Sequence, residues 1–459
     1  MSDCQQENSM NRRTFLKSSV VVTAGAASRV RAPAIIHAQG VQSPVVYALI
    51  GAGSQGRNHL RNLSTLKSGR CAVLCDTYEV NLKKGLKEIG NQPETETNDY
   101  RRVLERKDVE AVFITTPYYL HVPMILDAMS AGKHVFVEKC MMKTEAEIPL
   151  VYEAKARHPE LVLQVGLQRR YSGVYQNAMR MIHNGILGKV MTIHAQWHRN
   201  TSWRRPVPDP KLERIINWRM YREYSGGLMA ELGSHMADVA NWVFESEPIV
   251  VSGVGGNDYW KDGREIFDNV SVVYEYPQGQ KFLFSAVGHN RYLDFSETIL
   301  GDRGTIVITL GRNNPRATFY PQKLALGAPT EKDKVTIPGE LDWMAGATIL
   351  EKEEGIPIYS ESSIDDKGFV AREIRHARRW LIEMGVIEVG RERNPIQAED
   401  EHFFECIRQG KTPLANLDVG AADSRSVIYA NRAMEEKQRV NWPTQQMDGL
   451  ETALLNKKV

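Results

Sequence analysis

Cysteine is scarce in this sequence: five occur among 459 residues, and no two of them form a C-x-x-C pair. Cys4 lies in the first forty residues, and the other four are Cys71, Cys75, Cys140 and Cys406. They are too few and too scattered for a disulfide scaffold, and no zinc-ligand spacing is present. We therefore expect neither disulfide bonds nor a bound metal.

A large net charge and long apolar runs are also lacking. Lysine and arginine number 58 against 56 aspartates and glutamates, which gives a net charge of +2, so no global field favours nucleic acid or an anionic membrane. Beyond the N-terminal region, no apolar run approaches the roughly 18 residues that a membrane span needs. The length and the 42% hydrophobic content predict a soluble protein of two domains, without nucleic-acid partners or a membrane span in the mature chain.

The first forty residues differ from the rest. The segment NRRTFLKSSVVVTAGAAS places Arg12 and Arg13 ahead of a short, weakly apolar stretch. This order resembles a twin-arginine export signal, with Asn11 in place of the more usual serine. We expect a signal peptide and linker over 1–40, a periplasmic or exported bacterial protein, and the twin-arginine machinery as a partner. A basic N-terminal tail is the alternative.

A nucleotide site is indicated by PVVYALIGAGSQGRNHLRNL, residues 44–63. Its apolar run predicts a buried strand, and Gly51, Gly53 and Gly56 follow at G-x-G-x-x-G spacing, before a helix. The three glycines permit a tight turn, close approach of a pyrophosphate and close packing of helix on strand, while the helix N-terminus attracts an anion. A glycine-rich turn in an α/β domain without nucleotide is the alternative.

The next predicted strand, CAVLCD, favours one dinucleotide over the other. It ends in Asp76, twenty residues after Gly56, where an acid is expected to bind the ribose hydroxyls. A carboxylate there repels a 2′-phosphate, and Thr77 and Tyr78 follow it rather than arginine. We therefore expect NAD as the cofactor and consider NADP less favoured.

Strands and helices continue to alternate as far as residue 166. VEAVFITTP and HVFVEK are typical of buried strands, with an amphipathic helix between them, and LVLQVGLQRRY predicts a fifth strand. This alternation predicts a Rossmann-like, doubly wound parallel sheet over 41–166, with ligands at the carboxyl ends of its strands. The expected cofactor-binding residues are Gly51, Gly53, Ser54, Gln55, Gly56, Asp76, Thr116, Pro117, His121, Glu138 and Lys139.

After residue 166 the β-rich segments become longer and are joined by short turns such as YPQGQ and GDRG. Direct turns between strands mean antiparallel pairing. We expect a second α+β domain over 167–459, with an open and mainly antiparallel sheet. One face of that sheet could meet the active site or a second subunit.

Ahead of these strands, SGGLMAELGSHMADVANWVFE predicts a helix entered through two glycines. Glu231, His235 and Asp238 fall at i, i+4 and i+7, so they share one face. An ordinary surface pair explains Glu231 and His235 equally well from the helix alone. A zinc site is disfavoured, because E-x-x-x-H offers two ligands where a catalytic zinc needs three.

The chain after residue 44 resembles the Gfo/Idh/MocA family (glucose–fructose oxidoreductase, inositol dehydrogenase and rhizopine catabolism proteins), whose members are NAD(P)-dependent oxidoreductases. The motifs that match are GAGSQGRNH, TTPYYLHVPMILDAMSAGKHVFVEK, QVGLQRRY, GGLMAELGSHMADVANW and FFECIRQGKTPLANLDVGAADSRSVIYANRA. The resemblance implies a pyranose or polyol site between nicotinamide and open sheet. It also implies a homodimer or homotetramer formed through that sheet.

The resemblance further implies three catalytic residues. Lys139 would hydrogen-bond the reacting hydroxyl, and His235 would act as acid or base, since hydride leaves a carbinol carbon only as the hydroxyl proton departs. Glu231 would orient the histidine ring. Two positions depart from the family pattern: Cys140 replaces the proline after the lysine, and Glu231 replaces an aspartate. The geometry of that loop and the contacts of the longer acid are therefore open.

The segment 197–224, WHRNTSWRRPVPDPKLERIINWRMYREY, interleaves aromatic rings with arginines. Rings stack on pyranose faces and guanidiniums bind hydroxyls or acidic groups, so a sugar-binding loop is one interpretation. An arm that grips a neighbouring subunit is the other. The expected substrate-binding residues are Arg169, Tyr171, Trp203, Arg204 and Asp238.

These features predict an NAD-dependent oxidoreductase that acts on a sugar, a sugar derivative or a polyol. Export favours an alternative with a cofactor that stays bound, because the periplasm has no free nicotinamide pool. Such an enzyme would be a sugar–sugar oxidoreductase, or a glycoside hydrolase that oxidises, eliminates, hydrates and reduces again. A non-catalytic sugar-binding relative is a third hypothesis, and the fold alone does not exclude it.

Overall fold

The structure is a computed structural model that describes residues 43–89, 93–310, 315–322, 355–358, 369–389 and 393–443. The export signal predicted over 1–40 lies outside these residues. The described part of the chain belongs to one compact unit that begins at Ser43. Within it, no helix combines the length and the apolar character needed to cross a membrane.

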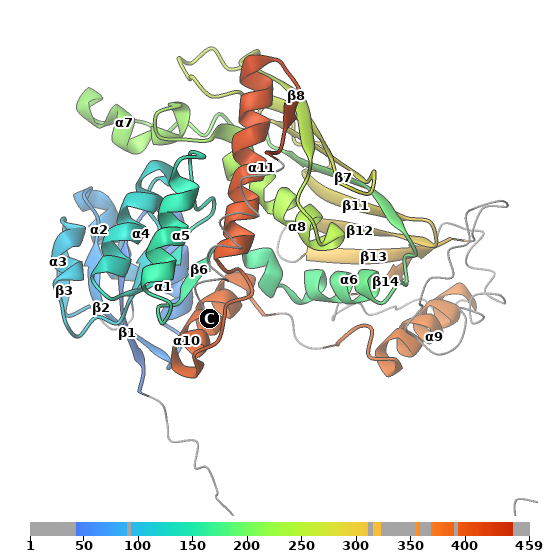
Figure 1. The fold of residues 1–459 in the computed structure, drawn as a ribbon, viewed down its shortest axis with the longest axis horizontal. Helices are drawn as coiled ribbons and strands as arrows, with labels where there is room; N and C mark the ends of the chain where they lie inside the picture. Colours follow the sequence, from blue (N-terminus) through green and yellow to red (C-terminus); the bar gives the residue numbers. More distant parts are fainter. Residues whose placement is uncertain are drawn as a thin grey trace, which may run out of the picture. The chain divides into compact units, whose positions relative to one another are not determined.

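The first sheet consists of six parallel strands in the order β3-β2-β1-β4-β5-β6 (Figure 1). Its strands are β1 (Val45–Ile50), β2 (Gly69–Cys75), β3 (Thr95–Thr97), β4 (Ala111–Ile114), β5 (His134–Val137) and β6 (Leu163–Val165). The strand order reverses between β1 and β4, and ligands bind in the crevice at such a point. The predicted Rossmann-like sheet is confirmed, although the fifth predicted strand is shorter and ends in a 3₁₀ turn, Gln168–Tyr171.

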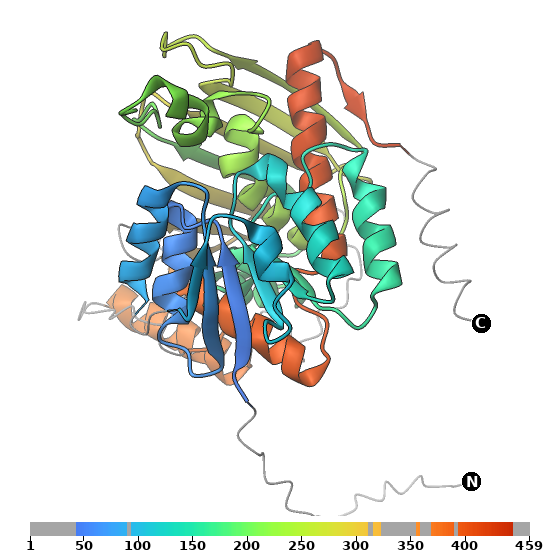
Figure 2. The same ribbon diagram turned by 90° about the vertical axis from the view of Figure 1, so that its left-hand side faces the viewer.

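Helices cover both faces of this sheet (Figure 2). They are α1 (Ser54–Leu63), α2 (Glu79–Glu88), α3 (Tyr100–Leu104), α4 (His121–Ser130) and α5 (Glu147–Arg157). In β1, Leu49 packs with Leu60 of α1, whereas the adjacent Ile50 packs with Ile125 of α4. Because both faces are buried, the strand sequence is continuously apolar rather than alternating.

The C-terminal part of the chain returns to the Rossmann sheet. Phe403 and Phe404 of α10 (Pro395–Gln409) are buried in the same cluster as Tyr47 of β1. The backbone N–H of Val165 also donates to the carbonyl of Ala415 at 2.9 Å. The predicted second domain, 167–459, therefore supplies part of the core of the first, which no local sequence pattern indicates.

The second sheet has nine strands in the order β14-β13-β12-β11-β7-β10-β9-β8-β15. They are β7 (Val190–His198), β8 (Val250–Gly256), β9 (Asn269–Glu275), β10 (Lys281–Val287), β11 (Phe295–Gly301), β12 (Gly304–Leu310), β13 (Pro315–Pro321), β14 (Ile356–Pro357) and β15 (Val440–Asn441). The turns YPQGQ and GDRG join antiparallel pairs, as predicted. The pairing of β7 with β10 is parallel, so the sheet is mixed.

One face of this sheet carries the second core. Phe282 and Phe284 of β10 pack with Met236 of α8 (Ser234–Phe244) and Ala433 of α11 (Leu417–Glu436). On the opposite face, Val273 of β9 is 36% exposed. The face away from the helices is therefore open, as expected. The remaining helices are α6 (Gly173–His183), α7 (Glu213–Ile216), α8 (Ser234–Phe244), α9 (Phe369–Glu383) and α11 (Leu417–Glu436).

Candidate active site

A cleft of about 310 Å³ opens where β1, β2, β4 and β5 end. Its first wall is the Rossmann sheet, and its second wall comes from segment 205–235 of the second domain. The cleft brings together Lys139, Glu231 and His235, the three expected catalytic residues. Ten of the eleven expected cofactor-binding residues also line it: Gly51, Gly53, Ser54, Gln55, Asp76, Thr116, Pro117, His121, Glu138 and Lys139.

The glycine loop has the shape that a dinucleotide needs. Gly51 has φ +101°, and a Cβ there would lie 2.7 Å from the carbonyl oxygen of Thr115. A Cβ on Gly56, which lies behind the loop, would come within 2.0 Å of the Gly51 oxygen. A Cβ on Gly53 would meet nothing within 4 Å, because the space in front of that residue is open. Helix α1 follows without a side-chain cap, so its first N–H groups remain for a pyrophosphate.

Asp76 is held at the end of β2 by backbone donors. Its Oδ2 accepts from the N–H of Ala52 and its Oδ1 from the N–H of Tyr78, each at 2.7 Å. Burial raises the pKa of this carboxyl above its ordinary value, against the lowering effect of the two N–H groups. The side chain of Asn81 also hydrogen-bonds this carboxylate. With three donors bound, the two oxygens keep capacity for one further donor such as a ribose hydroxyl, so the residues present fit NAD.

Lys139 follows the end of β5 and reaches the second domain. Its Nζ donates to the carbonyl of Ala230 at 2.8 Å and to the carbonyl of Glu231 at 2.9 Å. Both carbonyls belong to a π turn, Met229–Gly233, that precedes α8. A π turn interrupts the regular ladder of an α-helix and is often found at functional sites. The ammonium is thus fixed beside the turn that leads to His235.

His235 stands one residue into α8 with its side chain in the cleft. It is 6% exposed, and its Nδ1 is buried without a hydrogen-bond partner in the described chain. Burial, followed by the cations Lys139, Arg169 and Arg199, holds its pKa well below the ordinary 6.5. The imidazole is therefore neutral near pH 7 and can accept a proton.

Glu231 does not take the role expected of it. Its Oε2 accepts from the Nε of Arg219 at 2.9 Å, and among the described residues no hydrogen bond joins it to His235. The reason is the π turn, which changes the angular relation between positions 231 and 235 from that of a regular helix. The expectation that Glu231 orients the histidine is corrected: its charge instead positions Arg219 at the cleft.

Glu138 belongs to a buried polar cluster beneath the cofactor side of the cleft. Its Oε1 accepts from His59 and from Gln55, each at 2.8 Å, and its Oε2 accepts from the backbone N–H of Lys139 at 3.2 Å. The other ring nitrogen of His59 contacts Asp400 of α10 at 2.7 Å. The two carboxylates raise the pKa of His59 despite its burial. Glu138 thus braces the strand end, and it holds the backbone of Lys139 rather than its ammonium.

Two residues near Lys139 are structural rather than reactive. The Cys140 thiol is 1% exposed, and burial raises its pKa well above 9, so a thiolate nucleophile is disfavoured. The peptide between Lys139 and Cys140 is cis. The ring nitrogens of His121 lie 2.7 Å from the carbonyl oxygen of Cys140 and 3.1 Å from that of Thr116. His121 therefore ties the ends of β4 and β5 together.

Three of the five expected substrate-binding residues are buried in ways that correct their predicted role. The Nη1 of Arg169 lies 3.1 Å from Glu297, and its guanidinium stacks on Phe295 at 4.5 Å. Asp238 is 2% exposed and binds Arg170 through two nitrogens. Tyr171 is 7% exposed and lies on a different cavity. Arg169 and Asp238 stabilise the second domain, whereas Tyr171 packs in a core cluster of the Rossmann sheet and its hydroxyl accepts from the N–H of Ala415. All three lie outside the cleft lining.

The other two candidates, Trp203 and Arg204, also lie outside the cleft lining. Trp203 packs on the core of the second domain, and Arg204 is paired with Glu213 at 2.6 Å. Other residues of the same segment line the cleft instead: Arg205, Ile215, Ile216, Trp218 and Arg219. Gln168, from the turn after β6, lines it as well. The interleaved aromatic and arginine pattern indicated this segment, but it carried no signal for which arginines face inward.

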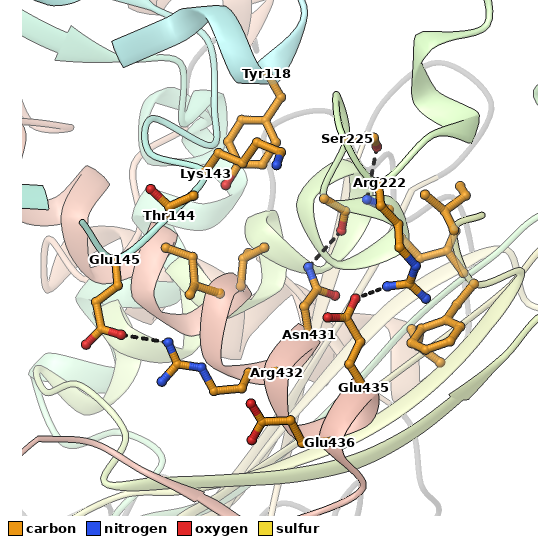
Figure 3. A pocket seen from close by; sticks show the side chains of 18 residues that line it. Tyr118, Lys143, Thr144, Glu145, Arg222, Ser225, Asn431, Arg432, Glu435 and Glu436 are labelled. Atoms are coloured by element: carbon orange, nitrogen blue, oxygen red, sulfur yellow. Dashed lines mark hydrogen bonds and ion pairs between the residues drawn. The ribbon is translucent and has the colours of Figure 1, made fainter. Parts of the chain in front are cut away.

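A second cavity, of about 380 Å³, lies on the other side of Tyr118 (Figure 3). The phenol donates to the carbonyl of Met142 and is 5% exposed, so it forms part of a wall between the two spaces. The charges in this cavity are largely paired, Arg432 with Glu145 and Arg222 with Glu435. None of the predicted site residues lines it.

Two family models match the chain. "Oxidoreductase family, NAD-binding Rossmann fold" covers residues 45–167, and "Oxidoreductase family, C-terminal alpha/beta domain" covers residues 179–442. The described cleft lies between these two parts and takes residues from both.

Individual relatives match less completely. Inositol 2-dehydrogenase of Gluconacetobacter diazotrophicus is 31% identical over 201 residues, 43% of this chain and 54% of the relative. Glycosyl hydrolase family 109 protein 1 of a Shewanella species is 27% identical over 238 residues, 47% of this chain and 51% of the relative. The chain thus spans about half the length of these curated relatives. The crystal structure of aldose-aldose oxidoreductase from Caulobacter crescentus has a TM-score of 0.63 at 22% identity, covering 87% of this chain and 100% of that one; at this identity the likeness shows the fold alone.

Proposed function

The chain belongs to the Gfo/Idh/MocA oxidoreductase family, whose Rossmann and C-terminal models together match most of it, and from this we propose that it is an NAD-dependent oxidoreductase. It transfers hydride at a carbinol carbon of a sugar, a sugar derivative or a polyol. The observation that carries the proposal is the shared cleft, in which Lys139 and His235 lie together with the glycine loop and Asp76.

The residues divide the reaction between them. Bound NAD supplies the hydride acceptor. His235, neutral because burial and neighbouring cations lower its pKa, takes the proton of the substrate hydroxyl as the carbon gives up its hydride and becomes a carbonyl. The ammonium of Lys139, fixed by two carbonyls, donates to the same oxygen and stabilises its developing negative charge. In the reverse direction, protonated His235 returns the proton.

The proposal includes an exported oligomer. The order of Arg12, Arg13 and the apolar stretch supports the twin-arginine route to the periplasm. The uncovered face of the second sheet, where Val254 is 72% exposed, supports a homodimer or homotetramer formed through that face. Cell fractionation and sedimentation of the mature chain test these two points.

The activity is tested by incubating the purified mature chain with NAD and a panel of sugars and polyols. A substrate must cause net formation of NADH, and His235→Ala must abolish it while NAD binding persists. If no carbinol substrate reduces NAD, or if the alanine variant keeps full activity, the proposal fails.

A redox-neutral glycoside hydrolase is the second candidate, favoured by the family 109 relative. In the same cleft, the sugar would be oxidised and would lose its aglycone by elimination. Water would then add to the sugar, and the sugar would be reduced again. Ordinary glycosidases need two carboxylates flanking the bond. Here Glu231 is paired with Arg219 and Glu138 with His59, so the acid–base groups proposed for the cleft are His235 and Lys139. Release of aryl aglycone that requires NAD without net NADH would identify this reaction, and net NADH from a free sugar would exclude it.

A further inference from the structure

The segment 199–224 forms an arm with fixed internal structure between β7 and the π turn. It contains 3₁₀ turns at Pro210–Leu212 and Trp218–Met220, on either side of α7. Asn217, 2% exposed, accepts from the N–H of Arg205 at 2.8 Å and donates to its carbonyl at 3.0 Å. The carbonyl of Met220 accepts from the N–H of Glu265 at 2.8 Å. The backbone of Arg205 is thus held in place.

The inner side of this arm forms part of the second wall of the cleft. Arg205, Ile216 and Trp218 line the same space as Gly53 and Asp76. The residues predicted from the Rossmann motifs therefore form one wall of the cleft, and the arm forms part of the other. A dinucleotide on the glycine loop would lie between that loop and the arm.

Most arginines of the arm have an acidic partner among the residues that the structure describes, and Arg205 does not. Arg199, at the start of the arm, also lacks one among the described residues, but its guanidinium lies over the ring of Trp197 at 4.9 Å and outside the cleft lining. Arg204 is paired with Glu213, Arg214 with Glu223 and Arg219 with Glu231. Within the described chain, the guanidinium of Arg205 has neither a hydrogen bond nor an ion pair, and its backbone groups alone are engaged.

The surroundings of Arg205 are positively charged. The side chain of Arg205 is exposed. Desolvation by the surrounding protein atoms still lowers the pKa of its guanidinium, the cations Arg219 and Arg57 lower it further, and Glu231 opposes them. Arg57 lies in the first turn of α1, beside the glycine loop. Glu231 is already paired with Arg219, so it neutralises only part of this positive charge, and an anionic ligand between the cations removes the remaining repulsion.

We propose that Arg205 binds the diphosphate of NAD from the side opposite to helix α1, so that the arm and the glycine loop together retain the cofactor between turnovers. This inference rests on the proposed function only for the identity of the ligand. The diphosphate has two charged faces: the first N–H groups of α1 satisfy one, and a forked guanidinium matches the other. The arm is hydrogen-bonded to the rest of the second domain, so the cofactor can leave only when the contact between Arg205 and the diphosphate breaks.

The test compares Arg205→Gln and Arg205→Lys with a matched control, Arg214→Gln, which removes an arginine of the same arm outside the cleft lining. The full mature chain is purified, and the NAD retained after gel filtration and the rate of NADH release are measured by fluorescence. Adenosine, ADP and NAD are then used as competitors of NADH.

We expect Arg205→Gln to bind ADP and NAD about ten-fold or more weakly, the size of effect typical for loss of one charge-assisted hydrogen bond. Adenosine should bind unchanged. NADH release should be faster and should lose much of its dependence on salt. Arg205→Lys should recover part of the affinity, and Arg214→Gln should behave as the unaltered chain.

Two results would overturn the inference. Equal affinities of Arg205→Gln and the unaltered chain for ADP and NAD would show that the arginine serves another ligand, such as an anionic substrate. Equal losses for adenosine and ADP would show that it only supports the arm. If Arg205→Gln has a lowered melting temperature, Arg205→Lys is used instead. Its loss of affinity for ADP, compared with its loss for adenosine, then tests the inference. None of these measurements uses a sugar, so failure of the proposed oxidation would leave them interpretable.

Discussion

The Nζ of Lys139 donates to the carbonyl of Ala230 at 2.8 Å, and that carbonyl also accepts from the hydroxyl of Ser234 at 2.9 Å. A strand end of the Rossmann sheet is thereby bonded to the turn that leads into the helix of His235. The two proposed catalytic groups come from different domains, and this contact sets their relation. Preorganised groups of this kind avoid reorganisation during the reaction.

Replacing Lys139 with methionine should lower kcat by roughly 10²–10⁴-fold, the range for loss of a group that acts on the transferred proton or the developing charge. NAD should still bind, because the glycine loop and Asp76 are untouched. Steady-state kinetics and NADH fluorescence measure the two quantities. Lys143→Met, which alters a residue of the second cavity, is the control and should leave both unchanged.

The pH dependence of kcat/KM should report the neutral form of His235. Its pKa lies well below 6.5, so activity should stay constant as pH falls to 6.5 and should decline only at lower pH, as the imidazole becomes protonated. Arg199→Gln removes one of the cations that lower this pKa and should shift the acid limb to higher pH. A decline centred above pH 6.5 in the unaltered enzyme would contradict the assignment.

Alanine substitutions at Gly56 and Gly53 should have different effects: the first on the stability of the fold, the second on the binding of NAD. Gly56→Ala places a Cβ 2.0 Å from a backbone oxygen and should cost about 3 kcal/mol of unfolding free energy, the upper end of the usual range for overpacking. Gly53→Ala meets open space at φ −63°, so the fold should be nearly unaffected, whereas NAD should bind about ten-fold or more weakly because the methyl group occupies the place of the pyrophosphate. Urea unfolding and NADH titration separate the two effects.

Asp238 should prove essential to stability rather than to substrate binding. Its carboxylate, 2% exposed, binds Arg170 at 2.7 Å. Asp238→Ala should cost about 3 kcal/mol, because it leaves unpaired a guanidinium whose side chain is only 12% exposed. The exposed pair of Arg61 and Glu88, also about 3.0 Å apart, offers a control: Glu88→Gln should cost at most about 1 kcal/mol. Urea denaturation measures both. If Asp238→Ala keeps full stability, the ion pair does not have this structural role.

Glu399 should reduce stability at high pH. It is fully buried, both of its carboxylate oxygens lack a hydrogen-bond partner in the described chain, and burial raises its pKa well above 4.5. The native state therefore favours the protonated acid, and its contribution to stability is greatest below pH 4.5 and falls as pH rises toward the higher folded pKa. Glu399→Gln removes this dependence, so it should be at least as stable as the unaltered chain at pH 8. Urea midpoints at pH 5 and pH 8 test the difference.

Local pattern was sufficient for the Rossmann half. The glycine spacing, the apolar runs and the acid at residue 76 each predict one strand or turn. In the structure, Gly51, Gly53 and Asp76 line one cleft. It was not sufficient for Arg169, Tyr171 and Asp238, because whether a polar side chain faces a cleft or a buried partner depends on residues far along the chain. Glu297, the partner of Arg169, is 128 residues away.

The helix of His235 shows the same limit within a single element. Helical spacing predicted that Glu231 and His235 share a face, yet the π turn between them sends the acid to Arg219 instead. A π turn is stabilised by contacts on its carbonyls. Here the contact from Ser234 is local, whereas the contact from Lys139 exists only after the two domains have come together.

By itself, the sequence determined the doubly wound sheet, the preference for NAD and the position of a lysine at a strand end, because hydrophobic period and glycine spacing act over a few residues. Only the tertiary structure decided which cations face the cleft, which acids are buried beneath it, and that α10 completes the Rossmann core. Those outcomes depend on burial and charge pairing between distant segments. The same long-range packing left the guanidinium of Arg205 without a partner among the described residues, in the cleft that the glycine loop also lines.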